Sequence, residues 1–268
     1  MNSAPNPARS PALGITAAML VIGNEILSGR TRDANLAPFA VRLGARGIQI
    51  REVRVVADIE GDIVAAVNAL RTAYDLVFTT GGIGPTHDDI TADAIARAFG
   101  RPIGEDPRAI AVLAAYYGPG GDFTPARRRM ARIPDGAALI ENPISAAPGF
   151  LIENVYVMAG VPRIAEAMLE AVIPSLPEGA VRHKAALAGP VAEGRIAEPL
   201  RQLQDAHPEI EIGSYPSYGQ GGYKTTIVMT STDPAALSLC KNEVARLFRG
   251  EGVEPVDEGN EPPAPPMR

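Results

Sequence analysis

The feature that most constrains the fold is a glycine-rich run at residues 79–93, between a short apolar segment and a helix-like segment. The segment before it, residues 75–78, is typical of a buried strand, and residues 92–99 have helical character. A strand, a glycine-rich turn and a helix in this order present free backbone N–H groups to a phosphate. The run therefore predicts an α/β unit with a phosphate site at its turn.

The residues within this run point to a charged ligand. Gly81, Gly82 and Gly84 would let a ligand approach the main chain, which a side chain would block. Asp88 and Asp89 follow where the helix begins. Beside a phosphate, two carboxylates make sense only if they hold a divalent cation or a substrate hydroxyl, because anions repel one another. A helix cap explains one aspartate alone equally well, but the whole run favours a ligand site.

Strand-like and helix-like segments alternate along the first two thirds of the chain. The strand-like segments are residues 18–22, 48–56, 76–79, 139–140, 150–152 and 155–158. The helix-like segments are residues 35–43, 62–73, 92–99, 107–117, 124–133 and 162–173. Repeated β-α units predict a three-layer α/β/α domain with a mostly parallel sheet, in which ligands bind beyond the carboxyl ends of the strands.

A proline-rich stretch at residues 174–179 is typical of a linker. The segments after it follow a β-α-β-β-α order, which predicts a small α+β domain. Within that domain, residues 214–222 form either a long hairpin or a lid that closes on the ligand. We therefore expect disordered tails at residues 1–14 and 251–268, an α/β domain at residues 15–175 and an α+β domain at residues 180–250.

Charge and cysteine content exclude several functional classes. The formal net charge of −6 argues against binding to nucleic acid or to a membrane surface. No segment reaches the ~18 uninterrupted apolar residues of a membrane span. The single cysteine, Cys240, excludes an intrachain disulfide and a multi-cysteine zinc site, and it fits a cytoplasmic location. Cys240 lies on an apolar helical face, so we expect it in the core rather than as a nucleophile.

Five ordered segments carry a family resemblance. They are residues 21–30, residues 33–35, the glycine-rich run, Asn142 with residues 147–150, and residues 158–162. Together they resemble the molybdopterin-binding domain of molybdenum-cofactor biosynthesis proteins. The resemblance is strongest to the N-terminal domain of competence/damage-inducible protein A and of eukaryotic FAD synthases, and it covers roughly residues 16 to 173. It implies the same α/β fold and a homo-oligomer.

The resemblance also implies a set of site residues. A phosphate ligand would be bound by Gly23, Glu25, Asp33, Asn35, Gly81, Gly82, Gly84, Pro85, Thr86, Asn142, Pro148, Gly149, Gly160 and Pro162. Asp58, Asp88 and Asp89 would hold a divalent metal (Mg, Mn or Co) and support catalysis. Asp58 follows a strand and is expected beside the glycine-rich loop, although capping of the next helix explains it equally well from spacing alone.

Two functions remain open on these grounds. The first is a metal-dependent pyrophosphatase that acts on a nucleoside diphosphate compound such as ADP-ribose or FAD, as the resemblance implies. The second is a non-catalytic binder of molybdopterin or a related pterin phosphate. The number of acids favours hydrolysis. The family usually has Asp at the position of Asn24, and more often Pro at that of Ala159, so a lost ligand or base could leave binding intact without hydrolysis. Arg127, Arg128 and Arg129 could also reach a phosphate, although solvated helix arginines are commoner.

Overall fold

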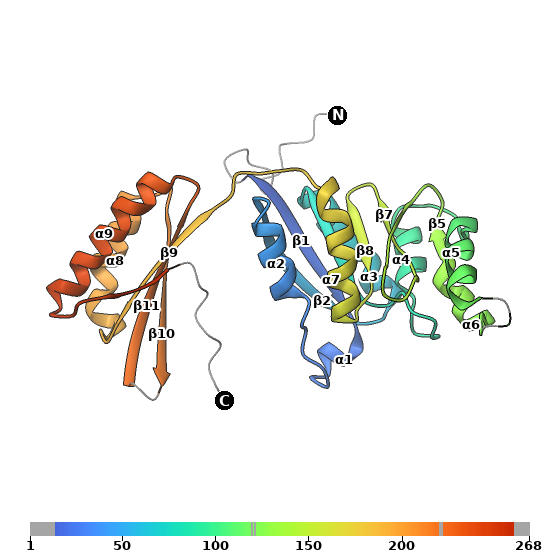
Figure 1. The fold of residues 1–268 in the computed structure, drawn as a ribbon, viewed down its shortest axis with the longest axis horizontal. Helices are drawn as coiled ribbons and strands as arrows, with labels where there is room; N and C mark the ends of the chain where they lie inside the picture. The colour runs from blue at the N-terminus through green and yellow to red at the C-terminus, as the bar shows by residue number, and fades with distance from the viewer. Residues whose placement is uncertain (1–13, 119, 121, 220–221, 260–268) are drawn as a thin grey trace. The chain divides into compact units, whose positions relative to one another are not determined.

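The computed structural model describes residues 14–118, 120, 122–219 and 222–259, and these residues form two compact units (Figure 1). Unit 1 ends at Ala180 and unit 2 begins at Val181. The tail expected at residues 1–14 lies outside the described residues, apart from Gly14. None of the helices in the described ranges is both long and apolar enough to cross a membrane.

Unit 1 is built on a six-stranded sheet in the order β2-β1-β3-β8-β7-β6. Its strands are β1 (Ile15–Ile22), β2 (Ile48–Val56), β3 (Leu76–Thr80), β6 (Ala138–Ile140), β7 (Gly149–Ile152) and β8 (Val155–Met158). The first four strands of that order pair in parallel, and β7 and β6 pair antiparallel. The predicted mostly parallel sheet is confirmed.

Helices cover both faces of this sheet, which gives the three layers. One face carries α2 (Leu36–Gly44) and α7 (Pro162–Val172), and the other carries α3 (Glu60–Ala73), α4 (Thr91–Ala98) and α5 (Pro107–Tyr117). Alternate residues of β1 enter the two cores: Leu20 and Ile22 pack toward α3, while Met19 and Val21 pack toward α2. Because both of its faces are buried, β1 is an almost continuous apolar run.

The carboxyl ends of four parallel strands lie at one edge of the sheet. Ile22 is in register with Val56, Val21 with Thr80, and Thr80 with Met158. The segments that follow these strands therefore emerge beside one another. The first of them contains the short helix α1 (Asn24–Leu27). This edge is where an open α/β sheet presents its ligand-binding loops.

The chain between α4 and β6 contains a segment, residues 124–133, that was predicted to be one basic helix. That segment instead forms α6 (Pro125–Arg128), the 3₁₀ helix η3 (Arg129–Ala131) and the strand β5 (Arg132–Pro134). β5 pairs antiparallel with β4 (Ile103–Glu105), a strand that was not predicted. Buried Ile133 and the missing N–H of Pro134 favour a short strand over continued helix.

Unit 2 is a four-stranded antiparallel sheet in the order β10-β11-β9-β12, with two helices. Its elements are β9 (His183–Gly189), α8 (Glu193–Ala206), β10 (Glu211–Gly219), β11 (Gly222–Ser231), α9 (Pro234–Gly250) and β12 (Val256–Gly259). β10 and β11 pair from Glu211 opposite Thr230 to Gly219 opposite Gly222. The described residues of the segment predicted as hairpin or lid thus lie in the two paired strands of a long hairpin, and residues 220–221 lie outside the described residues. Cys240 is fully buried in the core of this unit, as expected.

The expectation of a disordered tail from residue 251 is wrong for its first part. Val256–Gly259 forms β12, which pairs with β9 at an edge of the sheet. The acidic residues that suggested disorder instead form ion pairs at 2.5 Å, Asp257 with Lys241 and Glu258 with Lys224. Residues 260–268 lie outside the described residues.

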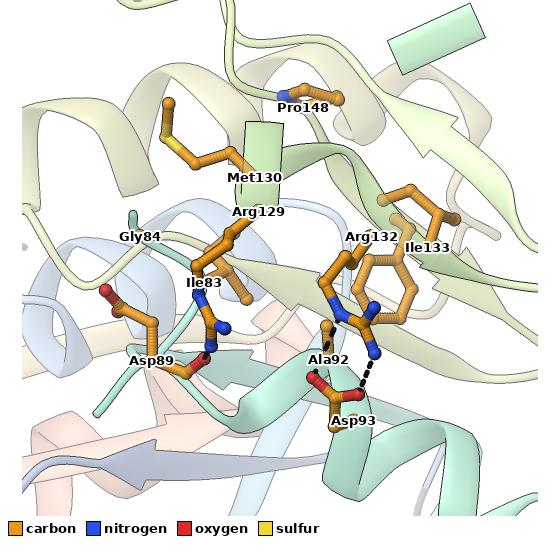
Figure 2. Close-up of a pocket in the computed structure, with 12 residues that line it drawn as sticks. Ile83, Gly84, Asp89, Ala92, Asp93, Arg129, Met130, Arg132, Ile133 and Pro148 are labelled. Atoms are coloured by element: carbon orange, nitrogen blue, oxygen red, sulfur yellow. Dashed lines mark hydrogen bonds and ion pairs between the residues drawn. The ribbon is translucent and has the colours of Figure 1, made fainter. Parts of the chain in front are cut away.

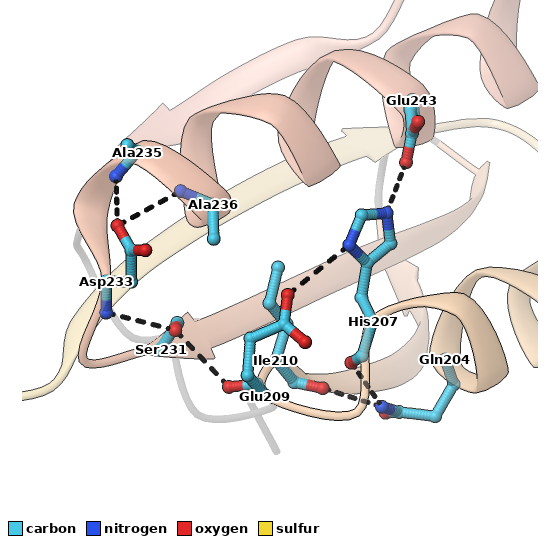
Figure 3. A network of polar contacts seen from close by, with 9 residues as sticks. All are labelled: Gln204, His207, Glu209, Ile210, Ser231, Asp233, Ala235, Ala236 and Glu243. Atoms are coloured by element: carbon cyan, nitrogen blue, oxygen red, sulfur yellow. Dashed lines mark hydrogen bonds and ion pairs between the residues drawn. The ribbon is translucent and has the colours of Figure 1, made fainter.

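A polar network in unit 2 joins the end of α8 to α9 and to the start of β10 (Figure 3). His207 Nε2 lies 2.7 Å from a carboxylate oxygen of Glu243, and its Nδ1 lies 3.5 Å from one of Glu209. Gln204 Nε2 donates to the carbonyl oxygen of Ile210 at 2.6 Å. The hydrogen bond with Glu243 is the main cause that raises the pKa of His207, and Glu209 adds to it.

Candidate functional site

The glycine-rich loop after β3 turns sharply at the carboxyl edge of the sheet. Gly81 and Gly82 have φ angles of +110° and +67°, in the left-handed region that favours glycine. A Cβ at Gly81 would lie 2.1 Å from the carbonyl oxygen of Ile22, at the end of β1. A Cβ at Gly160, after β8, would lie 3.1 Å from the Cα of Gly81. Glycine is needed here because the loops of three neighbouring strands pack against one another.

The next contact of this loop is with the start of α4. A Cβ at Gly82 would lie 2.2 Å from Thr91 Oγ1, and the Thr91 N–H donates to the Gly82 carbonyl at 3.0 Å. Thr91 is fully buried, and its hydroxyl has no hydrogen-bond partner among the described residues. Buried polar groups are nearly always satisfied in proteins, so a ligand atom or an ordered water is the expected partner.

Asp89 accepts hydrogen bonds from another residue of the same loop. Its Oδ2 accepts hydrogen bonds from the Thr86 N–H at 2.8 Å and from the Thr86 hydroxyl at 2.5 Å. The N-cap residue of α4 is Ile90, and no side chain caps this helix. The alternative that Asp88 or Asp89 caps α4 is therefore wrong. Gly84 lies against the same carboxylate, because a Cβ there would be 2.6 Å from Asp89 Oδ2.

Not all of the predicted phosphate-binding amides are available. The Gly81 N–H donates to a carbonyl at the end of β8, the Thr86 N–H donates to Asp89, and Pro85 has no N–H. The three N–H groups of residues 82–84 donate to none of the residues that the structure describes. Three successive free amides therefore remain at the loop.

A small cleft, with an accessible volume of about 10 Å³, borders these amides (Figure 2). It is lined by Gly82, Ile83, Gly84, Asp89, Ala92, Asp93, Arg129, Met130, Arg132, Ile133, Pro148 and Phe150. Arg132 is held in an ion pair by Asp93, whereas the Arg129 Nη2 lies 3.5 Å from the Asp89 carbonyl oxygen. The lining residues come from the loop, from α4, from η3 with β5, and from β7 with the residue before it.

The cleft brings together only part of the predicted site. It includes four of the predicted residues, Gly82, Gly84, Asp89 and Pro148. Half of the lining residues that the prediction omitted come from η3 and β5, such as Met130 and Ile133. The only sequence signal for this wall was the run of arginines.

Asp58 follows β2, which is not the neighbour of β3 in the sheet, because β1 lies between these two strands. Its Oδ2 accepts the N–H of Asn24 at 2.8 Å, which ties the end of β2 to the segment after β1. Capping is also not its role: the N-cap residue of α3 is Ile59, and no side chain caps this helix.

Asp88 is exposed, and its pKa is lowered, with the nearby Thr86 side chain as the main cause. It therefore carries a full negative charge at neutral pH. In the described part of the chain, no three His, Cys, Asp or Glu side chains form a group that could hold a metal. A cation at this edge would rest on one or two carboxylates and would complete its shell with waters and ligand oxygens, as Mg²⁺ commonly does.

The segment after β1 contributes mainly to the architecture of the edge. Asp33 Oδ1 accepts the Leu36 N–H at 2.9 Å and so supports the start of α2. Asn35 is 4% exposed and its Nδ2 donates to the Gly160 carbonyl at 2.9 Å. The carboxylate of Glu25 lies over Gly23, where a Cβ would be 2.6 Å from its oxygen.

Three further predicted residues shape the loops. Asn142 Oδ1 accepts the N–H groups of Ile144 and Ser145, both at 3.1 Å, and its Nδ2 donates to the Ala147 carbonyl at 2.9 Å. A Cβ at Gly149 would lie 2.3 Å from the Val157 carbonyl oxygen, so glycine allows β7 and β8 to approach. Pro162 is the first residue of α7, where its missing N–H costs nothing.

Comparison with known proteins finds a similar family for each unit. Residues 18–178 match the family described as "Probable molybdopterin binding domain", and residues 182–257 match "FAD synthase, middle domain". The two matches meet at the boundary between unit 1 and unit 2.

Two relatives and one solved structure illustrate the similarity. A protein of Pyrococcus horikoshii is 31% identical over 257 residues, which cover 90% of this chain and 97% of the relative. A CinA-like protein of Desulfosudis oleivorans is 39% identical over 159 residues, which cover 58% of this chain and 38% of the relative. The crystal structure of the protein CinA from Thermoplasma acidophilum, described as having unknown function, is 37% identical with a TM-score of 0.56. That similarity covers 60% of this chain and 96% of the other.

Proposed function

The chain belongs to the molybdopterin-binding domain family, and on that premise we propose that unit 1 binds a small molecule through a phosphate at residues 82–84. The ligand is a nucleoside diphosphate compound or a pterin phosphate. The observation that carries the proposal is the run of three free amides beside the buried, unpartnered hydroxyl of Thr91. Successive N–H groups in a turn form an anion-binding concavity, so this loop suits a phosphate.

Hydrolysis of the bound diphosphate is the finer part of the proposal. Asp88 and Asp89 lie on the same loop as the free amides, and Thr86 occupies only the Oδ2 atom of Asp89. These two carboxylates would hold a Mg²⁺, Mn²⁺ or Co²⁺ ion, since one or two protein carboxylates are enough for such an ion when waters and phosphate oxygens complete its coordination. Asp58 fits this role less well, because β1 lies between its strand and the loop. A bound ion would neutralise charge on the phosphate oxygens and lower the pKa of a water.

A second candidate is a non-catalytic binder of molybdopterin or a related pterin phosphate. The family description favours it. So does Asn24, because the resemblance in sequence implies an aspartate at that position. The backbone N–H of Asn24 is engaged by Asp58, but an amide side chain there cannot act as a base. Binding through residues 82–84 requires neither a base nor a metal.

Product analysis separates the two candidates. Purified protein would be incubated with ADP-ribose or FAD and with Mg²⁺, Mn²⁺ or Co²⁺, and AMP would be quantified, with EDTA as the control. We expect AMP release that EDTA abolishes. Binding without AMP release under any metal would favour the pterin binder. If neither nucleotide nor a pterin phosphate bound, the phosphate site itself would be refuted.

We also propose, from the family resemblance, that the chain forms a homo-oligomer and acts in the cytoplasm. Light scattering on the purified protein measures the first directly, and a mass of one chain would contradict it.

A further inference from the structure

The four arginines of residues 127–132, two of which line the cleft, differ in what neutralises their charge. Three of the four in this segment have a carboxylate partner: Arg127 with Asp122, Arg128 with Glu105, and Arg132 with Asp93. Arg129 makes no ion pair with any residue that the structure describes. The one hydrogen bond of its guanidinium within those ranges is the 3.5 Å contact with the Asp89 carbonyl oxygen.

The backbone of Arg129 is held in place although its side chain is exposed. Arg129 is the first residue of η3, whose last residue, Ala131, is fully buried. The Ala131 carbonyl accepts the N–H of Asp106 at 2.8 Å. The guanidinium therefore projects from a fixed point of the backbone, and it lines the same cleft as Gly82 and Gly84 (Figure 2).

The balance of charge in the cleft depends on this residue. Its charged lining residues are Asp89, Asp93, Arg129 and Arg132, two acids and two bases, with a formal sum of zero. Arg132 and Asp93 neutralise each other in their ion pair. Without Arg129 the lining would carry a charge of −1 from Asp89, which would repel an anionic ligand.

We propose that Arg129 binds the second phosphate of a diphosphate ligand and makes the cleft selective for diphosphates over monophosphates. This inference rests on the proposed phosphate site at residues 82–84. The loop amides bind one phosphate, and the guanidinium, which comes from a different element, binds the next. A guanidinium donates two parallel hydrogen bonds to phosphate oxygens, a geometry that a lone ammonium does not reproduce. A monophosphate occupies the amides alone and gains nothing from Arg129.

The test compares two probes, ADP-ribose and AMP, by calorimetry in metal-free buffer with the wild-type protein and with Arg129→Gln. Arg127→Gln is the matched control, because it removes the same charge two residues away, outside the cleft lining. The wild type should bind ADP-ribose more tightly than AMP. Arg129→Gln should weaken ADP-ribose binding on the order of tenfold to a hundredfold and leave AMP binding nearly unchanged. Arg127→Gln should bind both probes as the wild type does.

Each other result overturns the inference in a recognisable way. If Arg129→Gln kept the wild-type preference for ADP-ribose, or lost affinity for both probes equally, Arg129 would not be the diphosphate contact. The same conclusion follows if the wild type bound the two probes equally well. If the wild type bound neither probe, the proposed nucleotide site would fail together with the inference. A circular dichroism spectrum and melting temperature equal to the wild type would show that Arg129→Gln is folded, as its exposure predicts.

Discussion

Gly82 and Thr91 pack so closely that a Cβ at residue 82 would lie 2.2 Å from the hydroxyl oxygen of Thr91. The same glycine has a φ of +67°. Gly82→Ala should therefore destabilise the protein by about 1–3 kcal/mol, from backbone strain and from displacement of a buried side chain. Gly104→Ala is the control, because a Cβ at Gly104 would lie in open space. Urea denaturation of the wild type and the two variants measures the free energy of unfolding. Unchanged stability of Gly82→Ala would contradict the described loop.

Gly84 offers a cleaner way to block the free amides. Its nearest neighbour is the end of the Asp89 side chain, which can move, and its φ is not left-handed. Gly84→Val should keep the fold but cover the amides, and the Kd for ADP-ribose should rise on the order of tenfold or more. Gly104→Val should bind as the wild type does. Normal binding by a folded Gly84→Val protein would remove residues 82–84 from the site.

The two aspartates of the loop should matter for turnover more than for affinity. Asp88→Asn combined with Asp89→Asn removes both carboxylates, yet an asparagine at 89 can still accept the hydrogen bonds from Thr86. If these acids hold a metal that activates water, kcat for AMP release should fall more than the Kd for ADP-ribose rises. Asp122→Asn is the control, because Asp122 is an exposed acid outside the cleft lining, and this variant should keep the wild-type kcat and Kd. An equal loss of binding and turnover would argue for a role in binding alone.

The stability of unit 2 should depend on pH through His207. The carboxylate of Glu243 stabilises the charged imidazolium in the folded state, so the pKa of His207 lies above its usual value of 6.5. The resulting stability is fully present below pH 6.5, and it is lost as the pH rises through the raised pKa. Urea denaturation at about pH 6 and about pH 8 should show a lower free energy of unfolding at the higher pH. His207→Gln should lose this difference, and an unchanged pH dependence would refute the assignment.

Cys240 should be chemically inert in the folded protein. Its side chain is fully buried, and burial raises the pKa of its thiol to about 11. Since the thiolate is the reactive form, a disulfide reagent such as DTNB should label Cys240 at neutral pH only after denaturation. Rapid labelling of the native protein would show that the core around α9 opens readily.

Much of the fold could be predicted because its signals are local. The apolar run of β1 and the helical spacing of α3 and α5 each follow from neighbouring residues, and the observed elements begin and end within a few positions of the prediction. β4 and β12 were missed because three or four residues carry no periodicity of their own. They become strands only because the edges of β5 and β9 need partners.

The site was harder to predict than the fold. The sequence places glycines and acids at the carboxyl edge, but it does not show which amides are already used. Whether Thr86 donates to Asp89 or to a ligand depends on the loop's closure. Arg129 is identical in type to Arg128 and Arg132, and only their ion pairs with distant acids distinguish it.

Phosphate binding to the amides of residues 82–84 can be observed by titrating ¹⁵N-labelled protein with ADP-ribose and recording ¹H–¹⁵N correlation spectra. We expect the amide signals of Gly82, Ile83 and Gly84 to move most and to saturate together with the Arg129 side-chain signal. Those of Gly81 and Thr86, which already donate within the protein, should move less. Saturating shifts confined to other parts of the chain, with these three amides unmoved, would contradict it.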